Sequence, residues 1–422
     1  MKWIPAWTGA AQGPYPIGSP AAQPDLSDAF PSAERGAADQ TLRLIIKPDI
    51  WGKAIRLRFS NAFGLKPVTF DGAFVGLHWS SGAIVPSTNQ PVTFTNSPDV
   101  TIAPGACIWS DPVTLNFVGN NDIKMLMGRN LAVSFHVVGE SGPMTWHAKA
   151  MSTSYLTPPG SGSQGHTEGE AEFKFSTTSW YFLNAVEMLA SDTTQTVVVF
   201  GDSISDGTFT TLNGDDRWSD VLSRRLHTRY GDTVSVVNAG IGGNRVVGPR
   251  QYSAEHAVDG GPSAQDRLER DVLSLSNVST FIWLQGINDF CDDANASVQD
   301  VVTAMRETVS RIRKKFPHSR IVGATLTSAL GSTIEGYGSI NQDKKRLELN
   351  NIIRNGCVFD AYIDFDAATS NCVTGQLKRE YQRDSTTGGP SDGLHPNRVG
   401  HLAMGATISV DSVIRTEQAW ID

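Results

Sequence analysis

A serine near the middle of the chain stands where its hydroxyl could do chemistry. The apolar run 197–200 leads directly into Gly201-Asp202-Ser203, a turn tripeptide that is followed by Ile204. A serine hydroxyl is a weak nucleophile at neutral pH, so it needs a base within hydrogen-bond reach and a third group that orients the base. A strand that runs into a tight turn predicts that Ser203 is presented as such a nucleophile.

Asp392 and His395 can supply the base and its orienting group. They are three residues apart in the segment 392–396, Asp-Gly-Leu-His-Pro, at a predicted junction between a loop and a helix. This spacing can place the carboxylate beside one imidazole nitrogen while the other nitrogen faces Ser203. The sequence therefore predicts His395 as the general base and Asp392 as the residue that orients it.

Two further blocks lie between these residues, 238–244 (Asn-Ala-Gly-Ile-Gly-Gly-Asn) and 286–289 (Gly-Ile-Asn-Asp). Together the four blocks follow the order found in the SGNH hydrolases, also called the GDSL esterase/lipase family. The resemblance covers roughly the last 230 residues. The motif residues match, except that Ile204 stands where the family's four-letter name has leucine, which is an isosteric change.

The resemblance implies an ester hydrolase with three donors for the oxyanion of a tetrahedral intermediate. These are the Ser203 backbone N–H, the Gly243 backbone N–H and the Asn288 side-chain amide. Donors of this kind are often the largest single term in catalysis. A glycine at position 243 lets the backbone approach the substrate closely, which a Cβ would obstruct.

The amino-terminal region resembles the branch of this family that carries a β-sandwich ahead of the hydrolase domain. The segments that carry this resemblance are 60–64, 145–147 and 179–182. The branch includes carbohydrate acetyl esterases of the xylan-degrading type and arylesterase-like enzymes. The resemblance therefore implies a small-molecule or carbohydrate ester as the substrate and no cofactor.

Composition narrows the class of protein. The chain has 422 residues, 40% hydrophobic and 18% charged, so two globular domains are expected, each with its own core. No run of about 18 consecutive apolar residues occurs, which argues against a membrane span. The formal net charge of −8 and the pI near 5.6 leave no basic field for nucleic acid. Neutral substrates fit this balance better than polyanions.

The first predicted domain, residues 1–192, has the pattern of an all-β sandwich of the jelly-roll kind. In the segment 53–60, Ile55, Leu57 and Phe59 alternate with two arginines, which is the period of a strand with one face toward solvent. The segment 131–137 repeats this alternation. Glycine, proline and asparagine separate the short apolar runs at the spacing of a sandwich. The sequence therefore predicts antiparallel sheets with one solvated face.

The second predicted domain, residues 193–422, alternates strands with amphipathic helices, which indicates βαβ units and a parallel sheet. The expected strands are 196–201, 233–238, 279–285, 320–326 and 361–365. Apolar residues at helical spacing mark helices over 218–226 and 298–316, and a last helix over 399–406 that Pro396 can begin. The fold predicted is a three-layer α/β/α, flavodoxin-like sandwich. Ligands bind at the carboxyl ends of such strands, where all four blocks fall.

The cysteines give no metal site, because none of the four has a spacing typical of metal ligands. Cys357 and Cys372 bracket a predicted strand and can form one disulfide or remain two separate thiols. The first residues lack the apolar core of a secretory signal. The chain is therefore expected to be either intracellular or the mature form of a secreted protein. The triplets 277–279 and 295–297 are glycosylation sequons, which tilt this choice slightly toward secretion, although such triplets also arise by chance.

Each assignment has a structural alternative. Ser203 can be a helix N-cap, the pair 392–393 a turn, and Asn288 an Asx cap. We expect Asp289 to be structural, because its charge would oppose a developing oxyanion. Ser205 and Asp206 are expected to satisfy free N–H groups in a first helical turn. Residues expected at the surface, with pocket lining as the alternative, are Arg217, Arg245, Tyr252 and His256. Those expected in packing roles are His147 and His401.

The sequence thus favours a metal-independent serine hydrolase of short acyl esters, with acetyl esters of carbohydrates or small aryl esters as substrates. A catalytically silent glycan-binding protein is the alternative from another class. An acyltransferase would use the same residues, and a lipase is a further alternative within the class. For the first domain we favour a structural role beside the active site over glycan binding, because the linker 190–195 is short.

Overall fold

The computed structural model describes residues 1–422 except 120–122, 250, 254, 357, 384–389 and 415–422. The described residues form two compact units. The first unit contains residues 1–192 together with 252–261, and the second contains 193–251 and 262–422. The short segment 252–261 therefore packs with the first unit although the chain on both sides of it belongs to the second.

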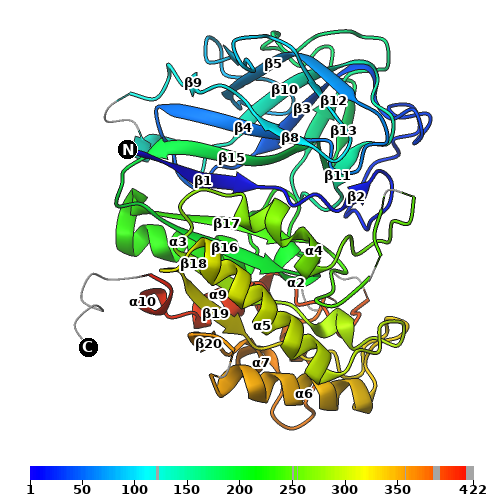
Figure 1. Cartoon of the computed structure of the whole chain (residues 1–422), viewed down its shortest axis with the longest axis vertical. Helices are drawn as coiled ribbons and strands as arrows, with labels where there is room; N and C mark the ends of the chain where they lie inside the picture. The colour runs from blue at the N-terminus through cyan, green and yellow to red at the C-terminus, as the bar shows by residue number, and fades with distance from the viewer. Residues whose placement is uncertain (120–122, 250, 254, 357, 384–389, 415–422) are drawn as a thin grey trace. The chain divides into compact units, whose positions relative to one another are not determined.

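The first unit is built from antiparallel strands (Figure 1). One sheet has the order β1-β15-β4-β8, with β9 also paired to β4, and a second has the order β13-β12-β3-β10-β5-β6, with β7 also paired to β5. A small third sheet has the order β14-β11-β2. The elements are β1 Lys2–Thr8, β2 Gly13–Pro14, β3 Ala38–Ile46, β4 Ala54–Ser60, β5 Val68–Leu77, β6 Gln90–Pro91, β7 Val100–Ile102, β8 Cys107–Trp109, β9 Val113–Thr114, α1 Ile123–Leu126, β10 Leu131–Glu140, β11 Thr145–His147, β12 Ser154–Leu156, β13 Phe175–Thr177, β14 Trp180–Tyr181 and β15 Leu183–Ala190.

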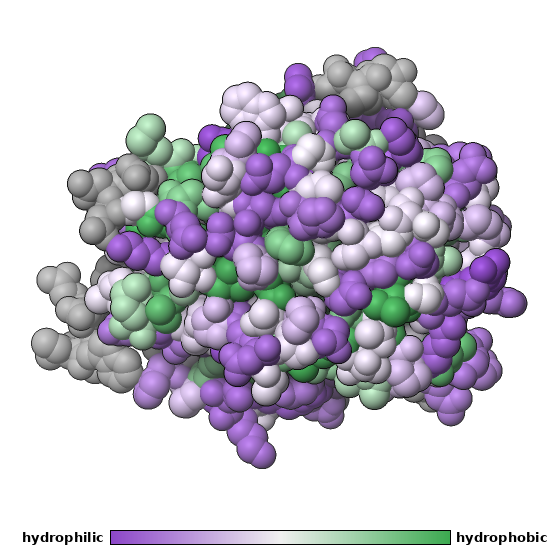
Figure 2. Space-filling view, turned by 90° about the horizontal axis from the view of Figure 1, so that it is seen from above, coloured by the Kyte–Doolittle hydropathy of each residue, from purple (hydrophilic) through white to green (hydrophobic). Residues whose placement is uncertain are grey.

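A single apolar core joins the two large sheets of this unit. Ile4 and Leu57 from one sheet and Leu42 and Val133 from the other are fully buried in the same cluster. Most aromatic rings of the unit are also buried, whereas Trp79 is 66% exposed. In the view of Figure 2, hydrophilic residues cover most of the visible face and apolar residues occur in small separate groups. The predicted sandwich of antiparallel sheets is confirmed.

The prediction of a solvated face on β4 is wrong in detail. Arg58 is buried, and its Nε donates to Asn184 Oδ1 at 2.9 Å. Arg56 lies between two tryptophan rings and forms an ion pair with the buried Glu187. Apolar residues that alternate with arginine have the sequence pattern of a strand with one solvent-exposed face. Long arginine side chains can nevertheless be buried against aromatic rings when carboxylates and amides pair with their guanidinium groups.

The second unit contains a five-stranded parallel sheet in the order β17-β16-β18-β19-β20, with helices on both faces (Figure 1). This is the flavodoxin-like strand order, so the predicted fold class is confirmed. The strands are β16 Gln195–Gly201, β17 Val234–Gly240, β18 Thr280–Leu284, β19 Arg320–Ala324 and β20 Ala361–Ile363. The helices are α2 Ser203–Asp206, α3 Trp218–Tyr230, α4 Ala264–Leu268, α5 Val298–Lys315, α6 Ile340–Arg354, α7 Phe365–Thr369, α9 Arg398–Thr407 and α10 Val410–Val413. The sequence did not predict α4, α6, α7 or α10.

The last long helix, α9, differs from its prediction in two respects. It begins at Arg398, and the Asn397 side chain caps it by accepting the backbone N–H groups of residues 399 and 400, so Pro396 lies outside the helix. The apolar residues that marked it are partly exposed, and the buried face instead carries His401 and Gly405. A Cβ at Gly405 would lie 2.5 Å from the Val221 Cβ, so the glycine permits close packing on α3.

The segment 252–261 is held in the first unit by specific contacts. Tyr252 Oη donates to the Gln12 carbonyl oxygen at 2.9 Å, and its ring packs edge-on against Phe63 with the centroids 5.4 Å apart. Gln12 Nε2 also donates to the Asp259 carbonyl oxygen. These contacts hold the segment 252–261 against the rest of the first unit.

We expect Tyr252→Phe to lower the free energy of unfolding by about 1 kcal/mol, because one hydrogen bond is lost. Tyr252→Ala removes the ring contact with Phe63 as well, and we expect a loss of about 3 kcal/mol. Thermal and urea unfolding of the full chain would measure both variants. If Tyr252→Ala were as stable as the wild type, the segment would not depend on this contact.

Candidate active site

Ser203 lies at the carboxyl end of the central strand β16 and is the first residue of α2. The Asp202 side chain caps this short helix by accepting the Ile204 N–H at 3.1 Å, and Gly207 ends it in a left-handed conformation with φ of 106°. The first N–H groups of a helix have no acceptor within the helix. The Ser203 backbone N–H therefore remains available beside its own hydroxyl.

The structure brings Ser203, His395 and Asp392 together. Ser203 Oγ lies 2.8 Å from His395 Nε2, and His395 Nδ1 lies 2.6 Å from Asp392 Oδ2. The other carboxylate oxygen, Oδ1, accepts the backbone N–H groups of Leu394 and His395 at 2.9 Å each. This line of contacts allows a proton to pass from the hydroxyl to the imidazole, with the carboxylate oriented against the opposite nitrogen.

The Asp392 carboxylate is kept ionised by these contacts. Burial acts to raise its pKa, but the hydrogen bond and charge of His395 together with the two backbone N–H groups outweigh burial and lower the pKa below its ordinary value. The His395 ring is packed as well as hydrogen-bonded, because the Phe209 ring meets it edge-on with the centroids 5.6 Å apart. Arg383 lies over the Phe209 ring at 4.7 Å. The base thus has a fixed orientation.

Two loops of the second unit place Gly243 and Asn288. Gly243 has φ of 76° in a turn closed by the Asn244 N–H donating to the Ile241 carbonyl oxygen, a conformation that favours glycine. The buried Asn288 follows β18, and its Nδ2 donates to the Asn244 carbonyl oxygen at 2.9 Å. An amide nitrogen carries two hydrogens, so one of them is left for an oxyanion.

Asp206 connects α2 to the loop that carries Gly243. Its Oδ2 accepts the Gly242 backbone N–H at 2.9 Å. This bond joins the helix that follows β16 to the loop that follows β17. Asp206 therefore lies in the helical turn where it was expected and accepts an N–H group of the following loop. Ser205 is buried in α2, and its hydroxyl has no hydrogen-bond partner among the residues that the structure describes. Asp206 thus supports the loop that carries Gly243.

The fully buried Arg267 of α4 joins the ends of two strands. Its guanidinium donates to the carbonyl oxygens of Gly201 and Ala239 at 2.9 and 2.8 Å, and its Nε donates to Asn244 Oδ1 at 2.7 Å. The guanidinium also lies over the Phe200 ring at 4.1 Å and pairs with Asp271. No pattern in the sequence predicts this role, because α4 is short and Arg267 resembles a surface arginine.

Two buried carboxyl groups of the site, those of Asp202 and Asp289, have raised pKa values. Burial raises the pKa of Asp202 to about 7, and the charge of Asp289 adds to this effect. Asp202 Oδ2 has no hydrogen-bond partner among the described residues. Burial raises the pKa of Asp289 to about 6, against the lowering effect of the backbone N–H groups of Val246 and Val247, which it accepts at 2.9 Å each. Asp289 therefore anchors the loop after Gly243.

The remaining candidate residues are distributed over both units. Arg217 caps α3 and donates to the Asp206 carbonyl oxygen at 2.8 Å, so it is not a solvated surface residue. Tyr252 and the exposed His256 belong to the first unit. His147 is buried there and stacks on Trp180. His401 is buried in α9, and its Nδ1 accepts the backbone N–H of residue 218.

Arg245 lines a polar groove of about 540 Å³ beside the loop that carries Gly243. The groove is formed by the loop after β17, the loop after β18, and the facing sides of α4 and α5. Its hydrogen-bonding side chains include Gln265, Asp293, Thr303 and Glu307. Within the described ranges, no group of three or more histidine, cysteine, aspartate or glutamate side chains is arranged to hold a metal ion. The lining can form hydrogen bonds with a hydroxylated molecule.

The described cysteines do not form a disulfide with one another. Cys107 and Cys372 are exposed and Cys291 is buried, each as a free thiol. The pairing considered for Cys357 lies outside the described residues. Where the structure is described, no helix combines the length and the apolar character that crossing a membrane requires.

Comparison with known proteins identifies the second unit. Residues 199–403 match the family described as the GDSL-like Lipase/Acylhydrolase family, which confirms the resemblance carried by the four sequence blocks. A comparison with curated protein sequences gives no significant match.

The solved structures that this chain is similar to each match about half of it. A carbohydrate acetylesterase from Sinorhizobium meliloti is 14% identical with a TM-score of 0.38, over 50% of this chain and 94% of that one. A putative arylesterase from Agrobacterium tumefaciens is 20% identical with a TM-score of 0.39, over 50% and 95%. The aryl esterase of M. smegmatis is 16% identical with a TM-score of 0.38, over 50% and 95%.

The raised pKa of Asp202 predicts a pH dependence of stability. An unfolded aspartate titrates near ~3.9, whereas the folded pKa of Asp202 is about 7. Between these values the folded state binds more protons, so ionisation of Asp202 lowers the free energy of unfolding as the pH rises. Asp202→Asn keeps an oxygen for the Ile204 N–H but cannot ionise. We expect its stability relative to the wild type to rise from pH 4 to pH 7, by up to ~1.4 kcal/mol per pH unit.

Urea unfolding at several pH values would measure this difference. Asp392→Asn is a control with a different pH window, because the lowered pKa of Asp392 stabilises the folded wild type above the unfolded pKa, and this stabilisation is lost only as the pH falls below about 4. The stability difference between Asp392→Asn and the wild type should therefore stay nearly constant from pH 4 to pH 7. A constant stability difference between Asp202→Asn and the wild type across this range would contradict the account of Asp202.

Proposed function

We propose that this chain, whose residues 199–403 belong to the GDSL-like lipase/acylhydrolase family, cleaves short acyl esters through an acyl-enzyme on Ser203. Carboxylic ester hydrolysis follows from membership of the family, and the proposal concerns the residues and the substrate. The observation that carries it is the line from Ser203 Oγ through His395 to Asp392, with contacts of 2.8 and 2.6 Å.

In the proposed mechanism, Ser203 Oγ attacks the ester carbonyl carbon while His395 Nε2 accepts the hydroxyl proton. The imidazolium is stabilised by Asp392, whose lowered pKa keeps it ionised. His395 then gives the proton to the leaving alcohol, and the acyl group remains on Ser203. Water attacks the acyl-enzyme with His395 again as the base, which releases the carboxylic acid and restores the serine.

The negative charge of each tetrahedral intermediate would be met by fixed donors. These are the backbone N–H groups of Ser203 and Gly243 and the free N–H of the Asn288 amide. Each donor is held before the substrate arrives, by α2, by the turn at Gly243 and by the contact of Asn288 with Asn244. Donors that need no rearrangement lower the barrier more than donors that must reorient.

We expect Ser203→Ala and His395→Ala each to lower kcat/KM for p-nitrophenyl acetate by at least about 10³-fold, because triad members act as a unit. The double variant should lose little more than either single variant, since neither residue works without the other. Steady-state kinetics beside unfolding curves would separate this loss from misfolding. Well-folded variants that keep wild-type rates would refute the assignment of Ser203 and His395. A wild type that cleaves none of the esters tested would favour the glycan-binding alternative.

The substrate that we propose carries a small acyl group on a hydroxylated alcohol, such as an acetylated carbohydrate. The support is the polar groove beside Arg245, whose side chains can form hydrogen bonds with hydroxyl groups. The net charge of −8 also favours a neutral substrate over a polyanion. In the binding mode that we propose, the acyl group would lie at Ser203 and the alcohol in this groove.

Thr303 lies on α5 at the exposed edge of this groove. We expect Thr303→Leu, which removes a hydroxyl and adds bulk, to raise KM for acetylated xylan oligosaccharides about fivefold, the effect of one lost neutral hydrogen bond. It should leave p-nitrophenyl acetate almost unaffected, because this substrate has no sugar. Thr303→Ser is the matched control and should behave as the wild type. Equal effects of Thr303→Leu on both substrates would reject the groove as the alcohol site.

A further inference from the structure

The loop between β19 and α6, residues 325–339, touches both halves of the candidate site. The Thr333 N–H and the Ser332 hydroxyl donate to the Asp392 carbonyl oxygen at 2.9 and 2.6 Å. From the same loop, Tyr337 Oη donates to Asn288 Oδ1 at 2.7 Å. One segment therefore contacts the residue that orients the base and the amide that faces the oxyanion.

Hydrogen bonds with Tyr337 and Asn244 together hold the Asn288 amide in one orientation. The Asn288 Oδ1 accepts from Tyr337, and Nδ2 donates to the Asn244 carbonyl oxygen at 2.9 Å. If the amide were turned over, its oxygen would face that carbonyl oxygen, and the Tyr337 hydroxyl would have to accept from the amide nitrogen instead of donating to the amide oxygen. The two contacts therefore select the orientation in which the second N–H of Nδ2 is free.

The backbone of Asn288 is fixed beside the same hydroxyl. Cys291 Sγ is buried and donates to the Asn288 carbonyl oxygen at 3.1 Å, and Arg245 Nη2 donates to this sulfur at 3.4 Å. Burial raises the pKa of Tyr337 far above its ordinary value, and the neighbouring Cys291 adds to this effect. The tyrosine is therefore protonated at neutral pH, and its hydroxyl can act as a donor.

The loop itself is held on both sides of Tyr337. Gly336 and Gly338 have φ of 79° and 88°, and a Cβ at Gly338 would lie 2.4 Å from the Ser332 nitrogen. The Gly331 N–H donates to the Gly338 carbonyl oxygen, and the Gly336 carbonyl oxygen accepts from Gln342 Nε2 at 2.6 Å. These contacts form a closed, compact loop in which the ring of Tyr337 has little freedom.

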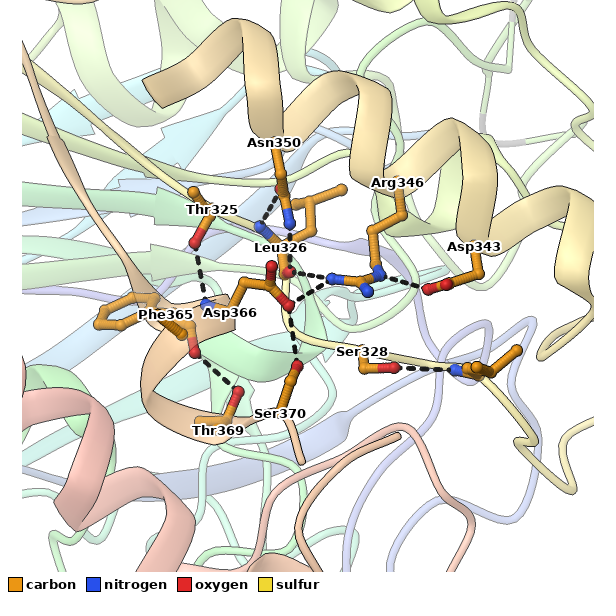
Figure 3. A network of polar contacts seen from close by, with 12 residues as sticks. Thr325, Leu326, Ser328, Asp343, Arg346, Asn350, Phe365, Asp366, Thr369 and Ser370 are labelled. Carbon is orange, nitrogen blue, oxygen red and sulfur yellow. Dashed lines mark hydrogen bonds and ion pairs between the residues drawn. The ribbon is translucent and has the colours of Figure 1, made fainter. Parts of the chain in front are cut away.

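The start of the loop is anchored by a buried polar network (Figure 3). Asn350 exchanges two hydrogen bonds with the backbone of Leu326, at 2.7 and 2.9 Å, as a neighbouring strand would. Arg346 donates to the same carbonyl oxygen at 3.1 Å and pairs with Asp366 at 2.6 Å and Asp343 at 2.7 Å. Such a fully paired network is rigid, so α6 holds the loop in one position.

We propose that Tyr337 is the positioning residue of the oxyanion hole, whose hydroxyl holds the Asn288 amide with its free N–H toward Ser203. This inference rests on the proposed function, since it requires Asn288 to stabilise an oxyanion. Tyr337 touches no reacting atom and acts through Asn288 alone. We therefore expect Tyr337 to affect the rate only through the transition state, in which the Asn288 amide donates to the oxyanion.

The test is Tyr337→Phe in the full chain, which removes the hydroxyl and keeps the ring. We expect kcat for p-nitrophenyl acetate to fall about tenfold, the effect of one lost hydrogen bond near 1.4 kcal/mol, with KM within about twofold of the wild type. Asn288→Ala should lower kcat by about 10²-fold. Tyr337→Phe should have almost no further effect when Asn288 is already alanine, because its only path to the reaction is gone.

Tyr230→Phe is the matched control, because its hydroxyl donates to Asp411 on the periphery of the same unit. It should keep the wild-type kcat. The inference is overturned if Tyr337→Phe keeps the wild-type kcat, or if it lowers kcat by the same factor with and without Asn288. Failure of the proposed function is a different result: a wild type without esterase activity, or activity that does not depend on Ser203.

Discussion

The arrangement of the candidate site depends on the buried guanidinium of Arg267. It binds the carbonyl oxygens of Gly201 and Ala239, at the ends of adjacent parallel strands, and the side-chain oxygen of Asn244 in the loop beyond them. A buried charge is tolerated only when it is well paired. Burial lowers the pKa of Arg267 to about 10, and Asp271 opposes this effect, so the group stays charged at neutral pH. One side chain therefore fixes the distance between the loops that carry Ser203 and Gly243.

Other buried polar groups extend this framework. Asn244 also receives a hydrogen bond from Gln285 and donates to the Pro262 carbonyl oxygen at 2.7 Å, while Asp289 holds the backbone that follows it. The proposed oxyanion donors are consequently not carried by free loops. Asn244, in the loop that carries Gly243, is held by hydrogen bonds from Arg267 of α4 and from Gln285, which follows β18. This is the rigidity that preorganised donors need.

The sequence predicted those site residues that a local pattern marks. Ser203 follows the apolar strand run 197–200, and Asp392 and His395 lie in a turn segment three residues apart. The partners Arg267 and Tyr337 carry no such signal, because a buried arginine and a surface arginine look alike in a short helix, and the loop of Tyr337 approaches Asn288 only through the tertiary fold. Likewise Arg58 was assigned to solvent, although aromatic rings and an amide cover it. Local periodicity cannot distinguish a solvated polar face from one that is paired.

The central claim, that the reaction passes through a covalent acyl group on Ser203, is tested most directly by trapping that residue. A p-nitrophenyl alkylphosphonate reacts with an activated serine, forms a phosphorus–oxygen bond and releases p-nitrophenol. We predict one adduct per chain, found by mass spectrometry on the peptide that contains Ser203, with activity lost in proportion to labelling. An adduct on another residue, or full esterase activity in chains labelled at Ser203, would contradict the account.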